Sequence, residues 1–154
     1  MKKFLVPAVL AVVCGIVATG CNKNRGYVTT TNPSMTADIG TFKFISSAVR
    51  TATIAPQLPD TLRGIIITGY TSDNVNPYDR IVLYIRNYKG EAGTYSIVQG
   101  QASAIYYHGG LVDSALGGVI AISNVTSLET TGYFKFNTKY GVTVNNGNYV
   151  ANNP

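Results

Sequence analysis

The sequence predicts an all-β fold, namely an antiparallel β-sandwich or a squat barrel of about nine or ten short strands. Two observations lead to this expectation. From residue 35 onward, apolar residues recur with the period of two that is typical of half-buried strands, and no stretch shows the longer period of a helix. Glycine, proline, asparagine and aspartate interrupt the pattern every eight to twelve residues or so, as turns do in sandwiches and barrels.

Three strands are predicted in the first part of the domain. Residues 36–44 place Phe42 and Phe44 on one face, and residues 48–54 are rich in threonine and β-branched side chains. Residues 62–70 contain three consecutive isoleucines and are apolar on both faces, which predicts a central strand.

The middle of the domain predicts a further strand and a hairpin. Residues 80–88 alternate, with aliphatic side chains on one face. Residues 93–98 and 102–107 are separated by Gln-Gly-Gln, which favours a hairpin between them. Only residues 112–116 and 126–130 leave room for a helical turn.

Four more strands are predicted at residues 118–125, 132–137, 140–144 and 148–150, and the last three have the clearest pattern. The Asn-Gly pair at 146–147 predicts a type I′ turn between the final two strands.

The N-terminus has the three-part plan of a bacterial export signal. A basic start at Met1-Lys2-Lys3 is followed by an apolar stretch at 4–18 and by small residues at 19–20. A bilayer-spanning helix needs roughly 20 apolar residues, so a permanent membrane helix is the weaker alternative.

Cys21 follows this signal directly, and Ala18-Thr19-Gly20-Cys21 resembles the lipobox of bacterial lipoproteins. The resemblance implies that Cys21 is lipidated and anchors the chain to a membrane; the alternative is a plain secretory signal cut near Ala18. We therefore divide the chain into a lipoprotein signal peptide (1–20), the lipidated Cys21 with a flexible tether (21–34), and a single β-sandwich domain (35–154). The other cysteine lies in the signal, so the domain has no disulfide.

The net charge of +5 does not belong to the domain. Lys2, Lys3, Lys23 and Arg25 precede it, which leaves eight basic against seven acidic residues from residue 35 onward. Without a basic excess, the sequence predicts no nucleic-acid partner.

Four short segments carry a family resemblance. They are MTADI at 35–39 followed by two phenylalanines, GTY at 93–95, GYFKF at 132–136, and VTVNNGNYV at 142–150. In these segments the chain resembles the small β-rich lipoproteins of unknown function that are abundant in Bacteroidota. The resemblance implies a cell-envelope location and brings no catalytic residues. No acidic residue follows Cys21 directly, which favours the periplasmic leaflet of the outer membrane over surface export.

The inventory of catalytic groups is small. The sole histidine, His108, lies at the end of a predicted strand before two glycines, and no G-x-S-x-G motif accompanies it. We therefore interpret His108 as an exposed loop side chain, and expect no catalysis and no cofactor. A small hydrolase is the most distant alternative.

The best oxygen-ligand cluster for a metal is Asp73, Asn74, Asn76 and Asp79, a weak calcium candidate. It lacks the glycine, the spacing and the final glutamate of an EF-hand loop. Asparagine, aspartate and proline are also the residues that an ordinary turn uses.

Two three-residue patterns resemble the Asp-(Ser/Thr)-apolar sites that these bacteria O-glycosylate. The acceptors would be Thr61 and Ser114. The favoured alternative is that each pattern is simply a turn that enters a strand.

Tyrosine is the overused aromatic residue, with eleven copies and no tryptophan. Tyr84, Tyr88, Tyr106 and Tyr107 form the candidate binding surface, and ordinary sheet packing is the alternative. The sequence thus predicts a lipid-anchored, non-catalytic binding or envelope-structural domain, whose partners are the membrane and an envelope protein or a glycan. The alternative function is an accessory carbohydrate-binding module that uses surface tyrosines.

Overall fold

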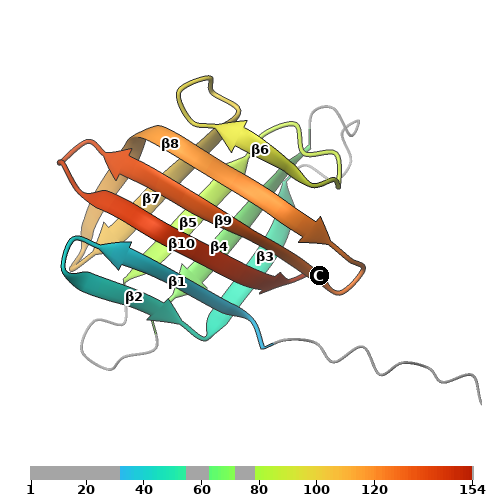
Figure 1. Cartoon of the computed structure of the whole chain (residues 1–154), viewed down its shortest axis with the longest axis horizontal. Coiled ribbons are helices and arrows are strands. Elements are labelled where there is room, and N and C mark those ends of the chain that lie inside the picture. The colour runs from blue at the N-terminus through green and yellow to red at the C-terminus, as the bar shows by residue number, and fades with distance from the viewer. Residues whose placement is uncertain (1–31, 55–62, 72–78, 154) are drawn as a thin grey trace, which may run out of the picture.

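The computed structural model describes residues 32–54, 63–71 and 79–153, and these residues form an all-β fold (Figure 1). Cys21, Thr61, Asp73, Asn74 and Asn76 lie outside the described residues. Within the described ranges, no helix is long and apolar enough to cross a bilayer. The ten strands are β1 (Ser34–Ile39), β2 (Phe42–Ser46), β3 (Ala48–Ile54), β4 (Gly64–Tyr70), β5 (Arg80–Ile85), β6 (Gly93–Ser96), β7 (Ala102–His108), β8 (Leu111–Val125), β9 (Glu129–Thr138) and β10 (Thr143–Asn152).

The strands form one continuous, mostly antiparallel sheet. Its pairings run from β3 through β4, β5, β7, β8 and β9 to β10. A single parallel pair, Asn152 with Arg50, then connects β10 back to β3. The β1–β2 hairpin extends from β10, and β6 extends from β8.

Strand β8 is the longest strand and pairs with different strands along its length. Residues 111–114 pair with β7, whereas residues 119–122 pair with β6. A bulge lies between Ala115 and Gly117, opposite β9. At Gly118, which has a φ of 130°, a Cβ would lie 2.2 Å from the carbonyl oxygen of Lys135. The backbone can therefore take this path only with glycine at this position.

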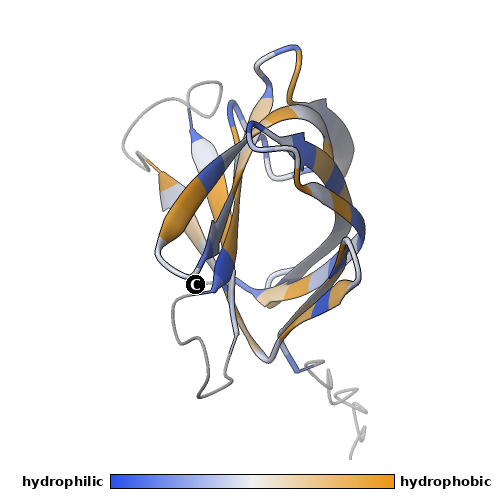
Figure 2. Cartoon of the chain, turned by 90° about the vertical axis from the view of Figure 1, so that its left-hand side faces the viewer, coloured by the Kyte–Doolittle hydropathy of each residue, from blue (hydrophilic) through white to orange (hydrophobic). Residues whose placement is uncertain are grey.

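The core is built from alternate residues of nearly every strand. Figure 2 shows apolar and polar residues alternating along the strands, as the period of two predicted. In β5, for example, Ile81, Leu83 and Ile85 are completely buried. The largest completely buried side chains are those of Phe44, Phe134 and Met35.

Two predicted strand boundaries were wrong. Residues 36–44 are not one strand, because the chain turns at Gly40, which has a φ of 58°, and forms the β1–β2 hairpin. The predicted turn at 146–147 is instead a bulge inside the single strand β10. A Cβ at Gly147 would lie 2.5 Å from the ring of Phe134, so this glycine serves packing rather than a turn.

The predicted hairpin of 93–98 with 102–107 was also wrong. A turn does separate the two segments, but β6 pairs with the later part of β8, and β7 pairs with β5 and the start of β8. Residues 112–116 form no helical turn, since they belong to β8. The wrong hairpin and the wrong helical turn have one cause, the long strand β8. Its first part pairs with β7 and its later part with β6.

Candidate functional site

The outer face of β3, β4, β5, β7 and the start of β8 carries aromatic and basic side chains. The strand register aligns Tyr70, Arg80 and Tyr107 in one cross-strand row. The neighbouring rows bring Arg50 and Tyr84 to the same face. We call this surface the aromatic–basic face. Its aliphatic members are Ile54, Ile66, Val82, Ile105 and Val112.

Arginine and tyrosine side chains contact each other on the aromatic–basic face. The guanidinium carbon of Arg80 lies 3.8 Å from the ring centroid of Tyr107, within the range of a cation–π interaction. The corresponding distance from Arg86, which follows β5, to the ring of Tyr84 is 5.8 Å. Among the described residues, no carboxylate projects from this face.

The structure divides the four predicted tyrosines between the surface and the interior. Tyr84 and Tyr107 lie on the aromatic–basic face. Tyr106 is only 5% exposed and belongs to the core, and Tyr88 is half-buried and packs against the core. The prediction that Tyr106 and Tyr107 form one binding surface is wrong, because adjacent residues of a strand point to opposite faces.

The interior tyrosines have structural roles. The hydroxyl of Tyr149 donates a hydrogen bond of 2.9 Å to the carbonyl oxygen of Ala121, and burial raises the pKa of this hydroxyl. Tyr88 and Tyr95 lie close enough to raise the pKa further. For Tyr106, burial and then the Asp79 carboxylate raise the pKa to about 12.

An Asp–His pair that sequence reasoning missed lies at the end of β7. Nδ1 of His108 lies 2.7 Å from Oδ2 of Asp79, and the backbone N–H of Gly109 donates to Oδ1 of the same carboxylate. The Asp79 side chain is 4% exposed, whereas that of His108 is 54% exposed. The ring of Tyr106 stacks on the imidazole. The pair therefore presents an oriented imidazole at the surface.

Hydrolases that form a covalent intermediate need a side-chain nucleophile beside such an imidazole. Within the described part of the chain, no hydroxyl or thiol hydrogen-bonds to His108. No local sequence pattern indicates this pair, because Asp79 and His108 are brought together by strand pairing. Arg80 pairs with Tyr107, which sets residue 79 opposite residue 108. Only the register of β5 and β7 reveals it.

The predicted calcium site stays a prediction, because Asp79 is the only one of its four residues among those described. The two carboxylate oxygens of Asp79 contact His108 and the backbone N–H of Gly109. In the described ranges, no three His, Cys, Asp or Glu side chains gather closely enough to hold a metal ion.

Only one of the two polar residues of the predicted glycosylation site at Ser114 is accessible at the surface. Ser114 is exposed, but the preceding Asp113 is buried. Its carboxylate accepts hydrogen bonds from the hydroxyl of Thr138 and, at 3.2 Å, from the backbone N–H of Tyr140. An enzyme that reads both Asp113 and Ser114 would therefore have to act before the chain folds.

Comparison with known proteins yields no match: no family model, no curated protein and no solved structure is similar to this chain.

Proposed function

We propose that the chain is a bacterial lipoprotein, related to the β-rich Bacteroidota lipoproteins that it resembles and anchored by an acylated Cys21. In this proposal, the domain faces the periplasm from the outer membrane and acts by binding rather than by catalysis. The signal-like segment and the cysteine that follows it support the anchor. Two or more acyl chains hold a protein stably on a membrane, so no spanning helix is required.

The observation that carries the binding role is the aromatic–basic face. An antiparallel sheet with one solvated face normally presents polar side chains outward. Here three polar residues, Thr68, Ser103 and Ser114, share the outward positions with aliphatic residues, three tyrosines and two arginines. Tyrosine and arginine dominate the energetics of protein interfaces. We propose that this face binds an envelope protein whose surface combines apolar and acidic side chains.

The anchor is tested by fractionating cells that express Cys21→Ala. The wild-type chain is expected in the membrane fraction with the added mass of two or more acyl chains, and the variant is expected without the lipid mass. Cys14→Ala is the matched control, because it removes the other thiol from the signal segment. Membrane retention and an unchanged mass in Cys21→Ala would show that Cys21 is not the anchor.

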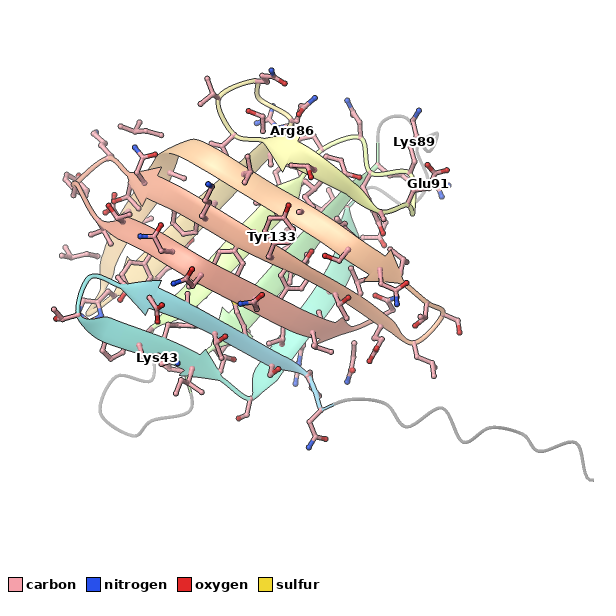
Figure 3. All side chains as sticks on the ribbon, viewed as in Figure 1. Lys43, Arg86, Lys89, Glu91 and Tyr133 are labelled. Carbon is pink, nitrogen blue, oxygen red and sulfur yellow. The ribbon has the colours of Figure 1, made fainter. Side chains whose placement is uncertain are left out.

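The binding surface is tested by cross-linking in intact cells, with Arg50→Glu as the variant. Arg50 is exposed on the aromatic–basic face, so charge reversal is expected to remove the cross-linked envelope partner. Lys43→Glu is the matched control, because Lys43 projects from β2, outside this face (Figure 3). Equal loss with both variants, or with neither, would contradict the proposal.

We further propose that the domain is a squat barrel rather than a sandwich of two separate sheets. The return of the pairings from β10 to β3 supports a ring of seven strands. The closing pair is Asn152 with Arg50. Nuclear Overhauser contacts between the backbones of these two residues are expected for the barrel and absent from an open sandwich.

A further inference from the structure

A second surface lies on the outer face of β1, β8, β9 and β10, distinct from the aromatic–basic face. Tyr133 projects from β9 on the side of the molecule seen in Figure 3 and is 46% exposed. It stands in a shallow hollow of about 290 Å³, which we call the Tyr133 hollow. The other side chains that line it with polar groups belong to Ser34, Thr36, Ser123, Thr131 and Asn148.

The strand register gathers these side chains from segments far apart in the chain. Thr36, Asn148 and Tyr133 are consecutive partners in one cross-strand row. Thr131 and Ser34 both flank Val150 in the next row. The ring of Tyr133 therefore has hydroxyl and amide groups beside it on neighbouring strands.

Parts of the Tyr133 hollow are fixed before any ligand binds. The side-chain amide of Asn148 donates a 2.9 Å hydrogen bond to the carbonyl oxygen of Asn146, which leaves its own amide oxygen as an acceptor. Beneath β9, Gly132 leaves space for the Tyr149 hydroxyl, because a Cβ there would lie 2.4 Å from it. A preorganised site avoids part of the entropy cost of binding.

The lining contains no charged side chain. Serine, threonine and asparagine side chains both donate and accept hydrogen bonds, as sugar hydroxyls require. The tyrosine ring offers a flat apolar face on which the C–H face of a pyranose can stack. An anionic ligand would lack a cationic partner among the lining side chains, the nearest lysine on β9 being Lys135 two residues along, and an apolar peptide would leave the hydroxyls unpaired.

From this geometry we propose that the Tyr133 hollow binds a neutral carbohydrate, with Tyr133 stacked on one sugar ring and Asn148 and Thr131 hydrogen-bonded to its hydroxyls. The proposal goes beyond the protein-binding role proposed for the aromatic–basic face, because it assigns a second ligand class to a separate surface. It retains the carbohydrate-binding alternative predicted from the sequence, but at a tyrosine outside the predicted set of four.

The test uses the full chain, isotopically labelled and purified in detergent. It is titrated with neutral hexasaccharides of glucose, xylose, mannose and N-acetylglucosamine in α and β linkages. We expect at least one of them to shift amide signals of the hollow residues. Tyr133→Ala should weaken that binding at least tenfold, whereas Tyr133→Phe should change it less than threefold because the ring remains.

Tyr140→Ala is the matched control, because Tyr140 is 70% exposed but lies in the turn after β9, outside the hollow. Affinity should be unchanged in this variant. The proposal is overturned if no hexasaccharide shifts the hollow, if Tyr133→Ala binds normally, or if Tyr140→Ala weakens binding equally. A chain that is acylated and cross-links through the aromatic–basic face, yet ignores every sugar, overturns this inference alone.

Discussion

At the residue scale, two carboxylates that lie outside the strands predicted from the sequence, Asp79 and Asp113, form hydrogen bonds that hold the structure together. Asp79 orients His108 and receives the backbone N–H of Gly109. Asp113 fixes the turn between β9 and β10 through Thr138 and Tyr140. Charged residues near turns are usually solvated, so composition alone suggests neither role. Both roles depend on partners at least 25 residues away in the chain.

Asp113→Ala is expected to lower the free energy of unfolding by about 2–4 kcal/mol. The substitution removes a charged acceptor of two hydrogen bonds and leaves the backbone N–H of Tyr140 unpaired, while the Thr138 hydroxyl keeps only its 3.2 Å contact with the carbonyl oxygen of Val142. Urea unfolding measures the difference. Ser114→Ala is the neighbouring control, and an exposed substitution of this kind should change stability by less than about 0.5 kcal/mol. Equal effects would show that the Asp113 contacts contribute little.

We expect the domain to lose stability at alkaline pH because of the buried side chain of Tyr106. Burial and the Asp79 carboxylate raise its pKa to about 12, above the value of about 10 in an unfolded chain. Its neutral form therefore contributes stability that is fully present below pH 10 and is lost as the pH rises towards 12. In urea titrations across this range, Tyr106→Phe should lose less stability than the wild type.

Tyr140→Phe is the control for this experiment, because Tyr140 is largely exposed. It should follow the wild-type curve over the same pH range. If Tyr106→Phe also follows that curve, ionisation of Tyr106 does not limit the alkaline stability.

At the element scale, glycines decide where strands bend and how closely they approach. The sequence prediction continued a strand through Gly40, where the chain turns, and placed a turn at Gly147, where the strand continues. Gly118 allows β8 to pass close to β9, and Gly132 makes room for Tyr149. These roles depend on which backbone lies opposite, so a local pattern cannot distinguish them.

Gly118→Ala is expected to destabilise the domain by more than about 3 kcal/mol or to prevent folding. The new Cβ would overlap the carbonyl oxygen of Lys135, in addition to the cost of a left-handed backbone. Gly100→Ala is the matched control, since Gly100 has a φ of 71° and open space around it. It should cost about 1–2 kcal/mol. Thermal unfolding followed by circular dichroism distinguishes the two outcomes.

At the scale of the whole molecule, the all-β class was predictable and the pairing of the strands was not. Alternation in β5 correctly predicted that Ile81, Leu83 and Ile85 share a buried face. The predicted and observed strand counts agree partly because two errors cancel. The predicted strand 36–44 is in fact β1 and β2, whereas the predicted strands 140–144 and 148–150 correspond to the single strand β10. The spacing of apolar residues identifies a segment as a strand, whereas the partner of that strand depends on contacts between distant segments.

The sequence by itself determined the all-β class, the inward-facing residues of several strands, and the expectation of an export signal that ends at Cys21. Those properties follow from local periodicity and composition. Only the tertiary structure decided that Tyr106 is buried while Tyr107 lies on the aromatic–basic face, that Asp79 meets His108, and that Tyr133 stands among neutral polar groups. The physical reason is strand register, which places side chains from distant segments on one face and is specified by packing across the whole sheet.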